Sequence, residues 1–119
     1  MAKIMIVDDS SIVRKTLKKQ IEDLGHEVIA EAENGKDAIK KYMRLKPDLV
    51  TMDITMPVTN GILALQEIRF QDENAKVIMI TSHGEESLVM DAVSHGASGY
   101  VLKPITKEKL ETQLKKTLG

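Results

Sequence analysis

Four short apolar runs of the chain are each followed by residues that can take part in metal or phosphoryl chemistry. The residues that follow them are Asp8-Asp9, Asp53, Thr81 and Lys103. If the runs are neighbouring parallel strands, these side chains meet at one edge of a sheet, because parallel strands all end at the same edge. Three carboxylates, a hydroxyl and an ammonium group in one place suit a divalent cation together with a phosphoryl group.

The three carboxylates would repel one another at such an edge. Two unit charges about 5 Å apart repel by roughly 3 kcal/mol at an effective dielectric constant near 20. This repulsion predicts either raised carboxyl pKa values or a bound cation. Mg²⁺ is the expected cation, because it is a hard ion that takes one or two carboxylates together with waters and a phosphate oxygen. The histidines His26, His83 and His95 share no ligand spacing, so no transition-metal site is indicated.

Asp53 is the candidate nucleophile, because it stands alone after the central apolar run and an aspartate can accept a phosphoryl group as an aspartyl-phosphate. Phosphoryl transfer mainly requires positioning and neutralisation of the phosphoryl oxygens. A Mg²⁺ held by Asp8 and Asp9 would neutralise one oxygen. The Lys103 ammonium would neutralise a second phosphoryl oxygen, and the Thr81 hydroxyl would donate a hydrogen bond to a third. Any one of these residues could be only a helix cap or a solvated side chain, but the four strand ends together favour a phosphoryl site.

The elements that would position these residues alternate along the chain. Each apolar run is followed by a segment with helical periodicity, and the runs begin near Lys3, Glu27, Asp48, Lys76 and Gly99. Five strand–helix units in succession predict an α/β fold. Because the strands are continuous apolar runs, we expect a parallel sheet with helices on both faces.

The limits of the first helix and the end of the second strand can also be read. Ser10 or Asp9 can cap the first helix, and Gly25 can end it. The second run ends in Glu31-Ala32 without an obvious reactive group. A position at the edge of the sheet, away from the point where the strand order reverses, would explain this difference.

Composition excludes several classes of protein. The 119 residues are 42% hydrophobic and 29% charged, which predicts one globular domain over residues 1–119 with no output domain. The net charge of −1 gives no broad basic surface for nucleic acid or an anionic membrane. The absence of cysteine excludes disulfides and thiol catalysis. No signal peptide or membrane-spanning run is visible, so we expect a cytoplasmic location without membrane insertion.

The chain resembles the receiver domains of two-component response regulators over essentially its whole length, and among them the single-domain chemotaxis regulators. The matching segments are residues 6–10, 52–57 with Asn60-Gly61, 80–82 and 96–104. The resemblance implies a flavodoxin-like (βα)5 fold, doubly wound, with a five-stranded parallel sheet in the order 2-1-3-4-5 and helices on both faces.

The resemblance also implies a role for each matching residue. Asp53 would be the phosphoacceptor, and Lys103 would contact the phosphoryl group. The Lys103–Pro104 peptide would be cis, which is a geometry nearly confined to X-Pro bonds. One Mg²⁺ would be bound per domain. Its ligands would be Asp8, Asp9, Asp53 and the backbone carbonyl of Thr55.

Further residues would carry the signal and set its lifetime. The resemblance implies that Thr81 moves towards the phosphoryl group and that Tyr100 changes rotamer, which alters the surface of the fourth helix, fifth strand and fifth helix. Thr55 stands where the best-known chemotaxis receivers have asparagine, and His83 stands where they have an acidic residue. Ile105 replaces a common phenylalanine. Thr55 and His83 would flank the path of the hydrolytic water, so we expect them to tune the phosphoryl lifetime.

The expected function is a phosphorylation-dependent signalling switch, not an enzyme for a separate substrate. A histidine kinase would phosphorylate Asp53, and the monomeric domain would then bind a target, with the flagellar motor switch in chemotaxis as the leading choice and a phosphatase as a further partner. One alternative is an intermediate phosphocarrier in a multistep phosphorelay. Another is an aspartyl-phosphate phosphatase, whose first strand would end in Asp-x-Asp instead of Asp8-Asp9-Ser10. A flavin or nucleotide module would need a glycine-rich loop that the sequence lacks.

Overall fold

Strands and helices alternate five times in the structure, a computed structural model that describes residues 1–119. The strands are β1 (Lys3–Val7), β2 (Glu27–Ala32), β3 (Leu49–Asp53), β4 (Val77–Thr81) and β5 (Gly99–Leu102). The helices are α1 (Ser11–Asp23), α2 (Gly35–Leu45), α3 (Gly61–Gln71), α4 (Glu86–Ser94) and α5 (Lys107–Leu118). The predicted alternation is therefore confirmed. None of these helices combines the length and the hydropathy that a membrane crossing needs.

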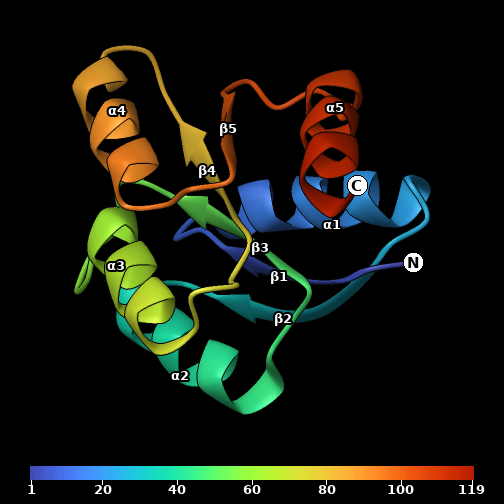
Figure 1. The fold of residues 1–119 in the computed structure, drawn as a ribbon. Helices are drawn as coiled ribbons and strands as arrows, with labels where there is room; N and C mark the ends of the chain where they lie inside the picture. Colours follow the sequence, from blue (N-terminus) through green and yellow to red (C-terminus); the bar gives the residue numbers. More distant parts are fainter.

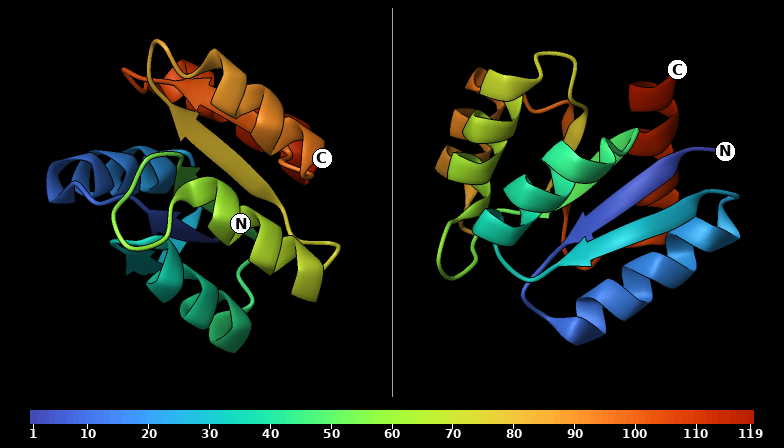
Figure 2. Two further views of the ribbon diagram at one scale, coloured as in Figure 1. Left: turned by 90° about the vertical axis from the view of Figure 1, so that its left-hand side faces the viewer. Right: turned by 90° about the horizontal axis from the view of Figure 1, so that it is seen from below.

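The five strands form one parallel sheet in the order β2-β1-β3-β4-β5, as predicted. Figure 2 shows β1 and β2 running side by side in the same direction. Their pairing shifts register between Ile4 and Met5, and the other strand pairs are regular. The strand order reverses between β1 and β3, so the chain leaves these two strands towards opposite faces of the sheet. A crevice at this reversal is where open α/β sheets bind their ligands.

Helices cover both faces of the sheet. Helices α1 and α5 lie on one face, and α2, α3 and α4 lie on the other (Figure 1). Side chains alternate along each strand between a core of 18 buried residues on the α2–α4 face and a core of 11 on the α1 and α5 face. Each fully buried large apolar side chain contributes roughly 1.5–3 kcal/mol to stability. Burial on both faces is the reason why the strands are continuous apolar runs.

Four of the five helices begin with a side-chain cap. In each, the side chain of the N-cap residue accepts a hydrogen bond from a backbone N–H three residues later, and these residues are Ser10, Asn34, Asn60 and Thr106. Ser10, not Asp9, therefore caps α1. Helix α4 differs, because its N-cap residue, Glu85, makes no hydrogen bond of this kind. The Glu85 carboxylate is free to be used elsewhere.

Candidate functional site

The three acids singled out in the sequence lie together at the carboxyl edge of the sheet. Asp8 and Asp9 follow β1, and Asp53 is the last residue of β3. One carboxylate oxygen from each acid lies within 4.8 Å of the others. Asp8 is fully buried, Asp53 is 6% exposed and Asp9 is exposed. The structure thus brings two buried carboxylates and one accessible carboxylate to the point where the strand order reverses.

Lys103 reaches this cluster of acids from the loop after β5. Its Nζ lies 3.5 Å from Oδ2 of Asp8 and 3.7 Å from Oδ1 of Asp53. Its backbone N–H donates a 2.7 Å hydrogen bond to the carbonyl of Thr81, which ties the loop to β4. The Lys103–Pro104 peptide is cis. Since no other lysine or arginine forms an ion pair with the three acids, the cluster keeps an excess of negative charge.

The pKa of Asp53 is raised from its ordinary value of 3.8 to about 7. Burial is the largest cause, followed by the negative charge of Asp8. The Lys103 ammonium acts in the opposite direction, while Asp9 and Glu85 raise the pKa further. The sequence-based expectation of a raised carboxyl pKa therefore holds at the candidate nucleophile.

The donor atoms of the cluster fit a hard divalent cation. Oδ1 of Asp8 accepts a 2.9 Å hydrogen bond from the Ser10 N–H, but Oδ2 is buried and has no hydrogen-bond partner. Buried polar atoms normally accept a hydrogen bond, and the nearest cation to this oxygen, Nζ of Lys103, lies 3.5 Å away, so a metal ion bound here would supply the missing partner. Three carboxylates without histidine or cysteine make an oxygen donor set of the kind Mg²⁺ prefers. Thr55 lies two residues beyond Asp53, in the loop between β3 and α3.

Glu85, which the sequence reading did not single out, connects two of the candidate residues. Its Oε1 accepts hydrogen bonds from the Thr81 hydroxyl at 3.1 Å and from the Ser82 N–H at 2.6 Å. Its Oε2 accepts a 2.6 Å hydrogen bond from the Thr55 hydroxyl. Burial acts to raise the pKa of Glu85, but the hydrogen bonds from Thr55, Ser82 and Thr81 outweigh burial and hold the pKa below its ordinary value.

Arg14 and Glu31 support Asp8 from outside the cluster. The Arg14 guanidinium donates a 2.7 Å hydrogen bond to the Asp8 carbonyl through Nη1. Its Nε pairs with the Glu31 carboxylate at 3.0 Å. In the sequence, Glu31 near the end of β2 had no obvious reactive role. In the structure it pairs with Arg14, and Arg14 in turn donates a hydrogen bond to the backbone carbonyl of Asp8.

The loop after β3 folds back closely over Asp53. The Gly61 N–H donates a 2.8 Å hydrogen bond to the carbonyl of Ile54. A Cβ atom at residue 61 would collide with the carbonyl oxygen of Asp53, so only glycine fits without displacing the backbone. In the same loop, Val58 has φ 69°, a left-handed conformation that is uncommon for a β-branched residue.

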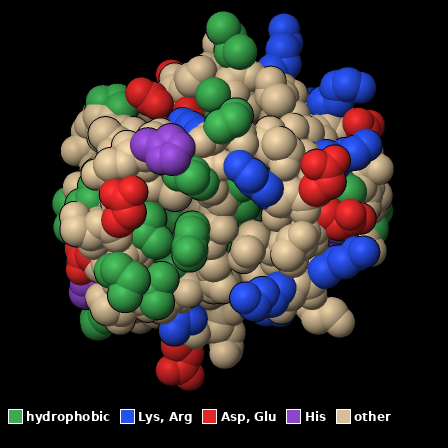
Figure 3. All heavy atoms as spheres, turned by 90° about the horizontal axis from the view of Figure 1, so that it is seen from above, with side chains coloured by type: hydrophobic (Ala, Val, Ile, Leu, Met, Phe, Trp, Pro, Cys, Tyr) green, Lys and Arg blue, Asp and Glu red, His purple; other side chains and the backbone are tan.

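Tyr100 and His83 lie outside the acid cluster. His83 is exposed in the loop between β4 and α4. The Tyr100 side chain is 50% exposed on β5, and it lines a cavity of about 370 Å³ together with Thr81, Glu86 and Met90. Figure 3 shows this side of the molecule, where hydrophobic side chains gather towards α4 and charged side chains gather towards α5. Thr81 therefore lies between Lys103, whose N–H donates to its carbonyl, and a partly apolar surface.

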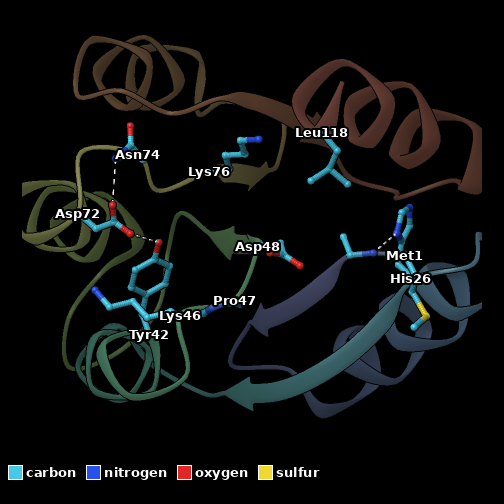
Figure 4. Close-up of a pocket in the computed structure, with 11 residues that line it drawn as sticks. Met1, His26, Tyr42, Lys46, Pro47, Asp48, Asp72, Asn74, Lys76 and Leu118 are labelled. Atoms are coloured by element: carbon cyan, nitrogen blue, oxygen red, sulfur yellow. Dashed lines mark hydrogen bonds between the residues drawn. The ribbon is translucent and has the colours of Figure 1, made fainter.

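The largest cavity, about 500 Å³, is not part of this site (Figure 4). It is lined by residues next to the amino ends of the strands, among them Ala2, Asp48 and Lys76. Its walls carry both signs of charge, and the Tyr42 hydroxyl donates a 2.7 Å hydrogen bond to Asp72 within it. The cavity lies between α2 and the loop after α3, and the three clustered acids are not among its lining residues. We therefore do not assign the metal and phosphoryl chemistry to it.

Comparisons with known proteins agree with the geometry. A family model described as the response regulator receiver domain matches residues 4–115. The chain is 44% identical over 116 residues to the chemotaxis protein CheY of Listeria monocytogenes, with 98% of each chain covered. It is 45% identical over 117 residues to CheY of Bacillus subtilis, again with 98% of each chain covered. A chain in the solved CheX–CheY–BeF3–Mg²⁺ complex from Borrelia burgdorferi superimposes with a TM-score of 0.94 at 36% identity, covering 98% of this chain and 89% of that chain.

Proposed function

This chain belongs to the response regulator receiver family, and from that premise we propose that Asp53 accepts a phosphoryl group from a histidine kinase. Receiver domains are signalling domains of two-component systems. The single observation that carries the assignment is the placement of Asp53 beside Asp8, Asp9 and Lys103 at the end of the central strand. The phosphorylated domain then signals by binding a target protein.

The proposed reaction needs little from the protein beyond positioning and charge. A carboxylate oxygen of Asp53 forms a bond to phosphorus, while the bond from phosphorus to the donor imidazole nitrogen breaks and its electron pair returns to that nitrogen. Lys103, at 3.7 Å from Asp53 Oδ1, neutralises a phosphoryl oxygen. The Thr81 hydroxyl donates to another. In the later hydrolysis of the aspartyl-phosphate, a water oxygen attacks phosphorus, the bond from phosphorus to the Asp53 oxygen breaks, and inorganic phosphate is released.

We propose one Mg²⁺ per domain, bound by Asp8, Asp9, Asp53 and the backbone carbonyl of Thr55. When bound, the ion supplies positive charge for the phosphoryl oxygens. Two observations support this assignment: Oδ2 of Asp8 is buried without a hydrogen-bond partner, and burial together with the charge of Asp8 raises the pKa of Asp53. A cation bound between the acids would offset both. The related complex from Borrelia burgdorferi contains Mg²⁺ and BeF3, which is the same combination of cation and phosphoryl-like group.

Chemotaxis is the pathway we propose, because the chain matches two CheY proteins over 98% of their length. The target would be a flagellar motor switch protein that recognises the face formed by α4, β5 and α5. The exposed hydrophobic residues Met90, Val93 and Tyr100 give this face an apolar part. Thr55 and His83 are proposed to set the phosphoryl lifetime, because both are exposed on the loops that adjoin the site.

Labelling with radioactive acetyl phosphate in the presence of Mg²⁺ tests the phosphoacceptor. The wild-type protein should be labelled, and Asp53→Asn should lose the label. Asp91→Asn, which changes an exposed acid on α4, should keep it. Undiminished labelling of Asp53→Asn would refute the assignment. The pathway is tested separately by offering the BeF3-treated protein a flagellar switch peptide and a histidine phosphotransfer domain, because selective binding of the latter would indicate a phosphocarrier instead.

A further inference from the structure

We propose that Glu85 is a positioning residue that holds the domain in its unphosphorylated arrangement by occupying the hydroxyl group of Thr81. The inference rests on the proposed function, because a phosphoryl group on Asp53 is what competes for this hydroxyl. Neither Thr81 nor Thr55 is free in the structure. Both donate their hydroxyl hydrogen to the Glu85 carboxylate.

The Glu85 carboxylate links the loop after β3 to the end of β4. Its Oε2 accepts from Thr55 in the loop after β3, at 2.6 Å, and its Oε1 accepts from Thr81 at the end of β4, at 3.1 Å. A threonine hydroxyl has a single hydrogen to donate. Thr81 can therefore donate to Glu85 or to a phosphoryl group on Asp53, but not to both at once.

Electrostatic repulsion between Glu85 and a phosphoryl group on Asp53 also opposes the simultaneous presence of both beside Thr81. The carboxylate of Glu85 is close enough to Asp53 to act on its ionisation. A phosphoryl group carries a charge of about −1.5 to −2 near neutral pH, so it repels Glu85 while attracting the Thr81 hydroxyl. Phosphorylation thus removes one partner of Glu85 and disfavours its position, and the contact to Thr55 is weakened with it.

The orientation of Glu85 differs from that of an ordinary helix cap. The N-cap side chains of the other four helices accept hydrogen bonds from their own first turn, but Glu85 does not. Its side chain instead accepts from Thr81 and Ser82, which precede the helix. Release of Glu85 therefore frees the start of α4, the helix that carries Met90 next to Tyr100 in the cavity beside Thr81.

The affinity of BeF3 in the presence of Mg²⁺, measured by titration, tests the inference. Glu85→Ala should bind BeF3 about tenfold more tightly than wild type, the effect expected from removing one hydrogen bond to a charged group. Glu85→Gln, which keeps the shape and loses the charge, should show a smaller gain. Asp91→Ala removes an exposed acid of the same helix that has no hydrogen bond to Thr55 or Thr81 and does not line the cavity beside Thr81, and this variant should bind BeF3 within about twofold of wild type.

A second measurement separates the release of Thr81 from a general loss of negative charge. Without BeF3, the NMR resonances of Thr81 and Tyr100 in Glu85→Ala should shift towards their positions in BeF3-bound wild type, and those in Asp91→Ala should not. Thr55→Val changes no charge but removes one partner of Glu85, so it should also tighten BeF3 binding. Its effect should not add to that of Glu85→Ala, because both remove the same contact.

The outcomes distinguish this inference from the proposed function. If wild type is labelled on Asp53 while Glu85→Ala and Glu85→Gln leave both the BeF3 affinity and the Thr81 resonance unchanged, the role of Glu85 is refuted and the function stands. If wild type neither binds BeF3 nor is labelled by acetyl phosphate, the function is wrong and the role of Glu85 is wrong with it. Should Glu85→Ala fail to fold, Glu85→Gln and Thr55→Val decide the question.

Discussion

Nζ of Lys103 lies 3.7 Å from Oδ1 of Asp53, although the two residues come from the loop after β5 and the end of β3. The contact lowers the pKa of Asp53 against burial and the neighbouring acids, which together still raise it to about 7. Lys103 is therefore the one side chain that favours the ionised form of Asp53, the proposed nucleophile, before a cation or a phosphoryl group is bound.

Replacement of Lys103 should make Asp53 still harder to ionise. In Lys103→Met the opposing positive charge is absent, so the pKa of Asp53 should rise above about 7. The pKa can be measured by carbon NMR titration of the labelled Asp53 carboxyl group in buffer without divalent cations. Lys107→Met removes an exposed lysine at the start of α5 and should leave the titration unchanged. An unchanged Asp53 titration in Lys103→Met would contradict the role of the contact.

The raised pKa of Asp53 also predicts how stability depends on pH. The folded-state pKa of about 7 lies above the ordinary value of 3.8, so the folded protein binds this proton more tightly than the unfolded chain does. The resulting stability is fully present below about pH 4 and is lost as the pH rises to about 7. Asp53→Asn cannot ionise, so between about pH 4 and about pH 8 its free energy of unfolding should rise by about 4 kcal/mol relative to that of wild type, at about 1.36 kcal/mol per pKa unit. Urea unfolding without Mg²⁺ at several pH values measures this, and a difference that does not change with pH would count against it.

Mg²⁺ should stabilise the folded protein through the acid cluster. At a concentration 100 times its dissociation constant, a ligand that binds only the folded state adds about 2.7 kcal/mol to the free energy of unfolding. Asp8→Asn and Asp9→Asn should lose most of the Mg²⁺-dependent rise in Tm. Glu73→Gln, which changes an exposed acid in the loop after α3, should keep it. An equal rise in Tm in all four proteins would place the cation elsewhere.

The sequence predicted the parts of the site that depend on topology. Asp8, Asp53, Thr81 and Lys103 all stand at strand ends, and parallel strands carry their ends to one edge whatever the side chains do. Arg14, Glu31 and Glu85 were missed, because their contacts depend on the direction of long side chains between elements that are distant in sequence. A signal for Glu85 was present, since its helix alone begins without a serine, threonine or asparagine at the cap. The left-handed Val58 had no signal of this kind, because valine does not favour that conformation.

Arg14 should matter for Mg²⁺ binding although it does not belong to the cluster. Arg14→Met removes the hydrogen bond to the Asp8 carbonyl and leaves the Glu31 carboxylate without its partner. Loss of such support around a metal ligand typically weakens metal affinity by about 10-fold to 100-fold. Titration calorimetry with Mg²⁺ measures the affinity, and Lys15→Met, at the next and exposed position of α1, serves as the control. Equal affinities in the two variants would show that Asp8 needs no support from Arg14.

Gly61 should tolerate no side chain. In Gly61→Ala the new Cβ meets the carbonyl oxygen of Asp53, so the backbone on one side must move. We expect a loss of about 1–3 kcal/mol in the free energy of unfolding, as for other overpacked positions. We also expect slower labelling by acetyl phosphate, because the displaced backbone carries the nucleophile. A variant with wild-type stability and labelling rate would show that the loop after β3 adapts freely.

The two hydrophobic cores lie on opposite faces of the sheet, and neither contains any of the residues at its reactive edge. The residues that pack the cores are therefore largely different from the residues of the acid cluster and from the exposed residues of α4, β5 and α5. The exposed side chains of α4, β5 and α5 belong to neither core, so substitutions among them would leave the packing of the domain intact. If this face binds the target protein as proposed, substitutions on it would change the binding partner without loss of the two cores that hold the sheet together.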